Sequence, residues 1–389
     1  MQKFRRILFE GIRNLDPVLF ICSILLSLIS IVIISGSVHN FGASKLRMQI
    51  AMFIVGSLVT FAIAYVDFRV LIDKLWLPML IGSAVLLITT LLFGTSGENM
   101  ETANQSWLKI PGTGLMIQPS EFVKFTFVCT FSKHLFSVRD HINHPKNILL
   151  LGLHAGLIVG LILLSGDLGV ALVYLAMIII MLFCAGLHPA YFIGAAVPVV
   201  ILSPFLWDSL AHYQQMRILV GFNPELDPIH YGWQPLLSRD AIAAGGFFGK
   251  GITGGGIYEV LTASHTDFIF ATVCEKLGFF GGSLVIMIFM VMVVRIFMIA
   301  RSAFRSDCGG LVCVGIGAML IVQVLENVGM CLAMLPVVGI TLPFLSCGGS
   351  SMLATFMMFG LLHNVHAHSQ GVRDSSTGDT LDINISLLR

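Results

Sequence analysis

The sequence predicts an all-α integral membrane protein with about ten transmembrane helices and two long loops that face outward. Hydrophobic residues make up 56% of the 389 residues, charged residues make up only 11%, and the mean hydropathy is +0.92. A soluble domain of this length carries far more charge on its surface. The apolar residues also fall into runs of about 20, which is the length that crosses a bilayer as a helix.

Each predicted helix is placed on one of these apolar runs. The helices cover residues 17–36, 48–66, 75–94, 118–138, 147–165, 167–186, 190–207, 267–300, 309–336 and 342–366. Because their number is even, both termini lie on one side of the membrane. Basic residues such as Arg69, Lys133 and Arg295 mark that side as cytoplasmic. The loops 95–117 and 208–266 then face outward, and loops of this length are usually functional or disordered.

Charge and cysteine spacing exclude other classes of function. The net charge is +1, and the basic residues lie in short segments between apolar runs, so no nucleic-acid-binding surface is expected. The eight cysteines are scattered singly, without the paired spacing of a zinc site. We expect them to pack as small apolar residues.

The first candidate for chemistry is Asp267, which follows His265 and Thr266 at the mouth of a long apolar run. A carboxylate is costly in hydrocarbon, so an ionisable residue at such a boundary is by default a functional-site candidate. The remaining sequence can be read as a membrane body built around this acid.

Polar residues also mark the starts of two other predicted helices. Trp107 leads to Pro119, and Glu121 and Lys124 follow three residues apart on one helical face. This pattern fits either a simple ion pair at a proline-initiated helix or a polar site at the outer rim. Asp167 likewise fits either an N-cap of the following helix or an acid that faces a polar cavity.

The second outer loop and the C-terminal part carry further candidates. Arg217 and Lys250 could hold an anionic group, and the glycine-rich run 245–251 permits close backbone approach to a ligand. In the segment 336–351, two prolines flank Gly339 and break the helix at its outer end. Non-helical backbone at membrane depth persists only where it is buried in protein or lines a cavity.

Together these residues resemble the SEDS family, which includes RodA, FtsW and SpoVE. The matching pieces, in family order, are Trp107, Gln118–Glu121 with Lys124, Asp167–Gly169, Tyr213–Gln214 with Arg217, Gly245–Gly251, His265–Ala271 with Glu275 and Gly278, and Pro336–Ser351. They span about residues 15–368, so residues 1–389 are expected to form a single polytopic membrane domain with short cytoplasmic tails. The start of the first helix is most similar to RodA.

Several positions depart from the family pattern. The family often has Arg, Gln-Pro, Pro-Glu, Glu and Tyr where this chain has Ser106, Ser165–Gly166, Thr262–Ala263, Lys276 and Cys347. These positions concern secondary ligand contacts and not the central acid.

The resemblance implies a peptidoglycan glycosyltransferase of the bacterial cytoplasmic membrane that polymerises lipid II on the outer face, for cell-wall elongation and cell shape. Asp267 would be the catalytic base of an inverting transfer. The residues expected to bind substrate are Trp107, Glu121, Lys124, Asp167, Arg217, Lys250, His265, Thr266, Glu275, Ser346 and Ser350. A divalent cation, Mg²⁺ or Mn²⁺, could assist the cationic residues at the leaving diphosphate. The implied partners are a class B penicillin-binding transpeptidase and other cell-wall elongation proteins.

Two other functions compete with this one. A lipid II flippase would use intramembrane acids such as Asp167 and Glu326, but a transporter places its ionisable groups near the midplane. Here Asp267, Glu121 and Lys124 gather at the outer rim. A catalytically idle scaffold would not require so many polar residues at one rim.

Overall fold

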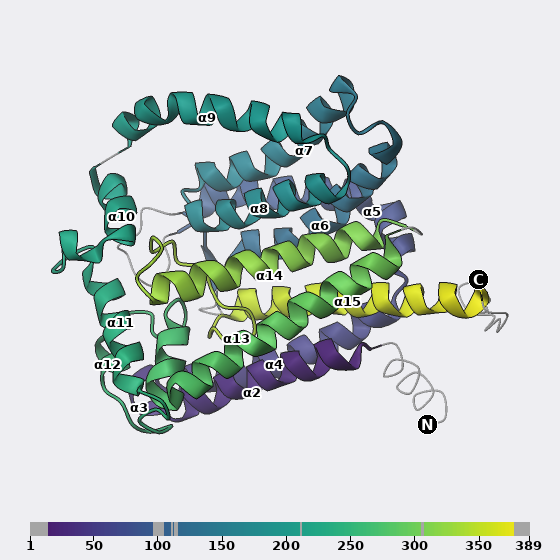
Figure 1. The fold of residues 1–389 in the computed structure, drawn as a ribbon. Helices are drawn as coiled ribbons and strands as arrows, with labels where there is room; N and C mark the ends of the chain where they lie inside the picture. Colours follow the sequence, from purple (N-terminus) through teal and green to yellow (C-terminus); the bar gives the residue numbers. More distant parts are fainter. Residues whose placement is uncertain are drawn as a thin grey trace, which may run out of the picture.

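The computed structural model describes residues 15–95, 105–109, 112, 116–210, 212–304 and 307–376. The expected tails, residues 1–14 and 377–389, lie outside the described residues. Within the described part, ten helices of 17 residues or more run lengthwise through the molecule (Figure 1). These are α2 (Pro17–Ser35), α4 (Ala43–Tyr65), α5 (Phe68–Phe93), α6 (Pro119–Val138), α7 (Pro145–Leu164), α8 (Leu168–Cys184), α9 (Pro189–Ser209), α13 (Ile269–Ala303), α14 (Gly309–Cys331) and α15 (Gly349–Ser376). The predicted all-α membrane architecture is confirmed.

Shorter elements connect these helices. They are α3 (Val38–Phe41), α10 (His212–Phe222), α11 (Trp233–Gly245), α12 (Ile257–Val260), the 3₁₀ turns η1 (Arg139–His141) and η2 (Pro224–Leu226), and the strands β1 (Leu108–Lys109) and β2 (Met116–Ile117). The two strands pair antiparallel, with Leu108 opposite Ile117. We call the end of the bundle that carries α10, α11 and α12 the loop end (Figure 1). Helix α2 begins and α15 ends at the opposite end.

The helix starts follow from local sequence. Pro17, Pro119 and Pro145 each stand at the first helical position, where a missing N–H costs nothing. Asp16 caps α2 by accepting a hydrogen bond from the Leu19 N–H, and Asp167 caps α8 in the same way through the Val170 N–H. The N-cap interpretation of Asp167 is therefore correct.

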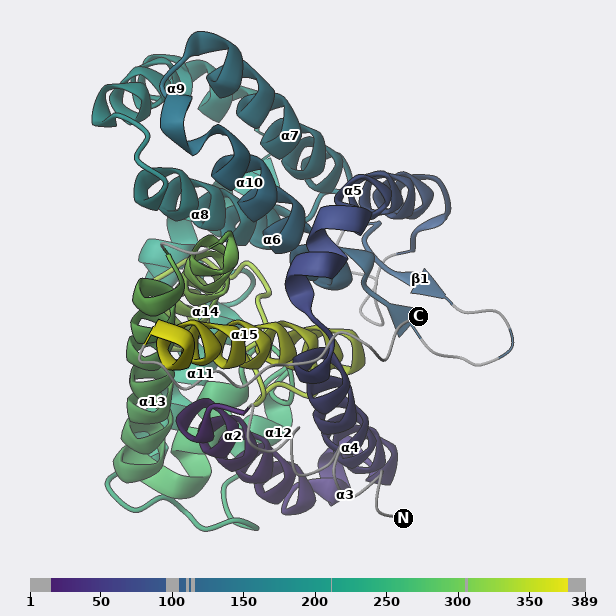
Figure 2. The same cartoon turned by 90° about the vertical axis from the view of Figure 1, so that its right-hand side faces the viewer.

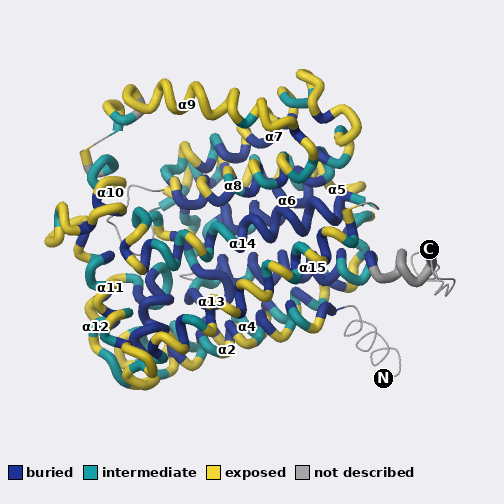
Figure 3. Tube along the Cα trace, viewed as in Figure 1, coloured by how far each residue is buried: buried dark blue, intermediate teal, exposed yellow. Residues whose placement is uncertain are grey.

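Two of the interior helices, α6 and α15, are more polar than the other long helices. Of the described helices, α2, α4, α5, α7, α13 and α14 are long and apolar enough to cross a membrane by length and composition alone, and α8 and residues 189–205 are shorter apolar helices. Helices α6 and α15 carry more polar residues, and both pack deep in the bundle (Figures 2 and 3). Helix α9 lies at the periphery, where none of its described residues is buried.

Some predicted boundaries were wrong, for identifiable reasons. Helices α4 and α5 begin five and seven residues earlier than predicted, because charged residues in their first turns interrupt the apolar run. About half of the outer loop 208–266 is helical, in α10, α11, α12 and η2. Helix α13 begins after Asp267 and is interrupted at Gly278. The φ of Gly278 is 69°, in the left-handed region that glycine adopts without steric cost. Helix α14 ends at Cys331, so the break before α15 spans residues 332–348.

Candidate active site

Asp267 lies at the loop end, in the turn between α12 and α13, and is half-buried. Burial raises the pKa of this carboxyl to about 6. A hydrogen bond with Thr266 opposes the rise in pKa, and the nearby charge of Asp167 adds to it. A carboxylate with a pKa near 6 is a better proton acceptor than an ordinary aspartate and is still ionised at neutral pH.

The main chain around Asp267 is fixed by the segment between α14 and α15, residues 332–348, which we call the α14–α15 loop. The Asn327 side-chain amide donates to the Asp267 carbonyl at 2.7 Å and to the Ile340 carbonyl at 2.7 Å. The Ser346 hydroxyl donates to the Thr266 carbonyl at 2.7 Å. These bonds fix the backbone on both sides of the carboxylate without occupying the carboxylate itself.

The α14–α15 loop also contacts two other helices. The Arg217 guanidinium on α10 donates to the Val337 carbonyl at 2.9 Å. A Cβ on Gly169 of α8 would lie 2.5 Å from the Val338 carbonyl oxygen, so glycine alone permits this approach. A Cβ on Gly339 would lie 3.4 Å from an Asp267 carboxylate oxygen. The loop therefore brings α8, α10 and the Asp267 turn together.

A second group of charges lies beside Asp267. The Lys124 ammonium and the Glu121 carboxylate are 2.7 Å apart, and their side chains are only 1% and 5% exposed. The Gln118 side-chain amide donates to Asp167 at 2.9 Å, and the Ser350 hydroxyl accepts from the Gln118 N–H at 3.2 Å. Glu121 and Lys124 therefore form the i,i+3 ion pair that one of the two sequence interpretations predicted at the start of α6, and the pair is buried.

Asp167 connects the two groups electrostatically. Burial raises the pKa of Asp167, the charge of Glu121 adds to the rise, and the bonds from Val170 and Gln118 oppose it. The same carboxylate acts on Asp267. Asp167 is therefore close enough to Asp267 on one side and to Glu121 and Lys124 on the other for their charges to interact, and a shared role of these four residues in binding substrate stays a prediction.

Other predicted residues are placed differently. The Glu275 carboxylate is fully buried and accepts hydrogen bonds from the N–H groups of Gly256, Ile257 and Tyr258 at 2.8 to 3.0 Å. This geometry fits a role in shaping the preceding loop. Lys250 is exposed, and its N–H donates to the Glu275 carbonyl at 3.0 Å. Substrate contacts by Glu275 and Lys250 stay a prediction.

Two more predicted residues stand at the margin of the cluster. The His265 ring lies 5.0 Å from the Phe41 ring, and the His265 carbonyl accepts from the Cys347 N–H at 2.8 Å. Trp107 pairs with Thr95 through two backbone hydrogen bonds and is half-buried. Both side chains belong to the loop end, and their contacts with substrate stay a prediction.

Asn327 and Gln118 were not among the predicted site residues. Asn327 is fully buried in α14. Gln118 orients the Asp167 carboxylate by donating a hydrogen bond to it. For Asn327, the available signal was an amide inside an otherwise apolar helix, since such a group must find partners in the protein.

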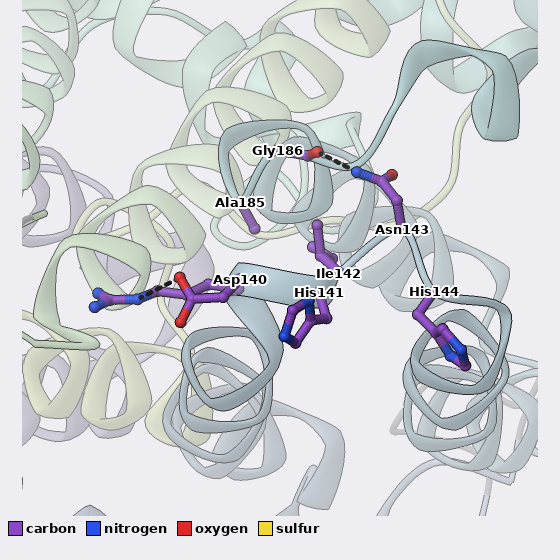
Figure 4. Close-up of a pocket in the computed structure, with 8 residues that line it drawn as sticks. Asp140, His141, Ile142, Asn143, His144, Ala185 and Gly186 are labelled. Carbon is purple, nitrogen blue, oxygen red and sulfur yellow. Dashed lines mark hydrogen bonds and ion pairs between the residues drawn. The ribbon is translucent and has the colours of Figure 1, made fainter.

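The described residues do not form a complete metal site, because no group of three or more His, Cys, Asp or Glu side chains could hold an ion. A hollow of about 460 Å³ lies at the opposite end of the bundle (Figure 4). It is lined by residues 139–144 with Ala185 and Gly186, and the Asn143 amide donates to the Gly186 carbonyl at 3.3 Å across it. None of the predicted site residues lines this hollow.

Comparison with known proteins supports the resemblance that the motifs suggested. The family FtsW/RodA/SpoVE, described as "Cell cycle protein", matches residues 14–371. The chain is 33% identical over 337 residues to the "Probable peptidoglycan glycosyltransferase FtsW" of Trichlorobacter lovleyi, covering 84% of both chains. It is 32% identical over 367 residues to "Peptidoglycan glycosyltransferase MrdB" of Escherichia coli, covering 91% of this chain and 94% of the relative.

A solved structure has the same fold. It is titled "Structural coordination of polymerization and crosslinking by a peptidoglycan synthase complex", and one of its chains superposes with a TM-score of 0.76 at 27% identity. The likeness covers 91% of this chain and 98% of that one. The match to the family over nearly the whole length, the two curated relatives and this shared fold lead to one conclusion: the chain belongs to the FtsW/RodA/SpoVE family of multi-pass membrane proteins.

Proposed function

We propose that this protein is a peptidoglycan glycosyltransferase that polymerises lipid II. Its relatives carry this activity in their names, and the loop end supplies the chemistry that the reaction needs. The observation that carries the proposal is Asp267, a half-buried carboxylate with a pKa near 6 whose backbone is held on both sides and whose side chain forms no ion pair among the described residues. A general base must be placed in this way.

The reaction joins a sugar hydroxyl of one substrate to the anomeric carbon of another. The hydroxyl oxygen forms the new bond as the bond to the diphosphate breaks, and Asp267 takes the hydroxyl proton. One displacement inverts the anomeric centre, so a single base suffices. Lys124 and Arg217 provide positive charge near the leaving diphosphate. A divalent cation at the diphosphate would add Lewis-acid stabilisation, and it would draw its ligands mainly from substrate and water oxygens, because the described residues alone offer no complete metal site.

We propose that the loop end faces outward, with both termini in the cytoplasm of a bacterium. Arg69, Lys133, Arg295 and Arg301 all lie towards the opposite end, which agrees with the usual enrichment of basic residues in cytoplasmic loops. Cysteines placed at Gln105 and Ile229 should react with a membrane-impermeant reagent from outside, and one at Asp140 should not. The native cysteines are buried, except for half-buried Cys184, so background labelling should be low. The reverse pattern would contradict this orientation.

We further propose a class B penicillin-binding transpeptidase as partner, with other elongation proteins, and a role in cell-wall elongation and cell shape. The resemblance to RodA at the start of the first helix supports this role. In overall sequence identity, the relatives named FtsW and MrdB are about equally similar to this chain, at 33% and 32%. Expression in strains lacking either the elongation or the division polymerase tests the assignment. Restored rod shape supports elongation, and restored division alone would contradict it.

Incubation of the purified protein with lipid II, with and without the transpeptidase, tests the activity itself. Glycan polymer on a gel is the expected product. A flippase would instead move fluorescent lipid II across proteoliposomes without forming polymer. That result would overturn the proposal, and the gathering of Asp267, Glu121 and Lys124 at one end makes us expect polymer.

A further inference from the structure

Four phenylalanines form an exposed cluster at the loop end. Phe247, Phe248, Phe279 and Phe280 are 69%, 82%, 61% and 57% exposed. The rings of Phe248 and Phe280 stack at 5.3 Å, and those of Phe247 and Phe279 meet edge to face at 6.0 Å. Large exposed apolar patches mark sites that contact protein or membrane.

The glycine-rich run 245–251 brings two of these rings onto the other two. A Cβ on Gly245 would lie 2.0 Å from the Cys274 carbonyl oxygen, and one on Gly249 would lie 2.1 Å from the Lys276 carbonyl oxygen. The Phe279 N–H donates to the Gly246 carbonyl at 2.8 Å, where α13 is interrupted at Gly278. The close approach that these glycines permit is therefore to the backbone of α13, and the loop and the broken helix form one unit.

The depth of this unit can be measured along two helices from a common level at the opposite end of the bundle. Asp16, at the start of α2, forms an ion pair with Arg295 of α13 at 2.6 Å. From Arg295 back to Phe279 is 16 residues (295 − 279), or about 24 Å of helix, which is less than the roughly 30 Å of a hydrocarbon core. Helix α2 spans about 28 Å to its end, where a Cβ on Gly36 would lie 2.2 Å from the Ile252 carbonyl oxygen.

We propose that Phe247, Phe248, Phe279 and Phe280 form a lipid anchor that inserts among the acyl chains of the leaflet at the loop end. The exposed apolar face of α13 continues directly from the cluster through Leu284, Met287, Met290, Val291 and Val294. Acyl chains that cover this face cover the cluster too. Lys250, exposed two residues beyond Phe248, lies where a lysine can extend to the lipid headgroups.

The anchor sets the depth of the segment that follows Asp267. Residues 269–277 run from the Asp267 turn to the break at Gly278. The 245–251 run is hydrogen-bonded to the end of this segment that lies away from Asp267. If the proposed glycosyltransferase function holds, the anchor positions the base relative to a lipid-linked substrate. Insertion itself does not depend on that function.

Photocrosslinking from single positions tests the anchor in the full-length protein in cells. The photoreactive benzoylphenylalanine replaces Phe248, lipid-facing Met290 or Ile229, which is 77% exposed in the connection between α10 and α11. After irradiation, purification and mass spectrometry, positions 248 and 290 should carry phospholipid adducts, with yields within about threefold of each other. Position 229 should carry at least about tenfold less.

Two outcomes would overturn the anchor: a Phe248→benzoylphenylalanine adduct to another protein chain, including a second copy, or no lipid adduct at 248 while 290 gives one. Thiol labelling provides a second measurement. In bilayers, Phe248→Cys should react with an impermeant maleimide at least about tenfold more slowly than Ile229→Cys, and equal rates would contradict insertion. Neither readout involves polymerisation, so a failed anchor and a failed glycosyltransferase assignment remain distinguishable.

Discussion

Each end of the bundle holds an aspartate just before a long helix, and the two carboxylates have different surroundings. Asp16, at the opposite end, is fully buried. Arg295 donates to its carboxylate through Nε at 2.7 Å and Nη2 at 2.6 Å, and His366 lies 3.7 Å away. Asp267, at the loop end, is half-buried, and its side chain forms no ion pair among the described residues.

The two acids therefore have opposite pKa shifts. Burial alone would raise the pKa of Asp16, but the Arg295 hydrogen bond, the Leu19 N–H and the charges of Arg295 and His366 outweigh it, so the pKa is lowered. Burial dominates at Asp267, and the pKa is raised to about 6. A fully paired carboxylate ties α2, α13 and α15 together, whereas an unpaired one is available to accept a proton.

Asp267→Asn should have the largest effect on activity. The variant keeps shape and hydrogen bonding but cannot take the acceptor proton, so lipid II polymerisation should fall by about 10² to 10⁴. Yield and Tm should be unchanged or slightly higher, because an unpaired half-buried charge is removed. Asp208→Asn, an exposed substitution on α9, is the control and should keep the wild-type rate. Normal polymerisation by Asp267→Asn would contradict the assignment of Asp267 as the base, and with it the contrast between a catalytic acid at one end and a structural acid at the other.

Substitutions of Glu121 and Lys124 test whether this pair contributes to the stability of the protein, to its activity, or to both. Because both groups are buried, Glu121→Gln or Lys124→Gln alone leaves an uncompensated charge and should cost about 3 to 5 kcal/mol of unfolding free energy. The double variant removes both charges and should recover most of that stability. If the pair belongs to the site, the double variant still fails to polymerise. Recovered activity would show that the pair is only structural.

Asp16→Asn should show the reverse of Asp267→Asn, with stability lost and intrinsic activity kept. Asparagine still caps α2, but Arg295 loses its carboxylate. Since the Arg295 side chain is 27% exposed, we expect a loss of about 2 to 3 kcal/mol, below the range for fully buried pairs. Denaturation of the purified protein measures the loss, with Asp140→Asn, whose side chain is 84% exposed, as a control expected within about 0.5 kcal/mol of wild type. A normal midpoint for Asp16→Asn would contradict the structural role.

The smallest effects concern pH. Polymerisation should be nearly constant above about pH 7, reach half its maximum near pH 6, and fall up to about tenfold per pH unit below that, as Asp267 becomes protonated. The stability contributions of Asp267 and Asp16 should depend on pH with opposite signs. Asp267 favours the folded state when protonated, so wild type loses stability relative to Asp267→Asn as pH rises from 3.8 through about 6.

Asp16 favours the folded state when ionised. Wild type should therefore lose its advantage over Asp16→Asn as pH falls below 3.8 through the lowered pKa. Tm measured across pH for the three proteins checks both signs. If the difference in Tm between wild type and each variant changed with pH in the same direction for both variants, the opposite pKa shifts of the two acids would be contradicted.

The site could be predicted in part because its residues carry local signals. Asp267 stands at the edge of an apolar run, and Glu121 and Lys124 have helical spacing, so residue type and neighbours sufficed. Glycine-rich run 245–251 shows the limit of such signals. Its composition permits close backbone approach, but only the fold shows that the approach is to α13.

Sequence alone determined that the chain is a bundle of apolar helices with an acid at the start of one of them, because hydrocarbon imposes its length and polarity on each segment separately. Tertiary structure decided what each acid does. Asp16 meets Arg295 from 279 positions away, and the Asp267 backbone meets Asn327 from 60 positions away. The pKa of a carboxyl depends on burial and on charges within a few ångströms, and in this fold distant segments supply both.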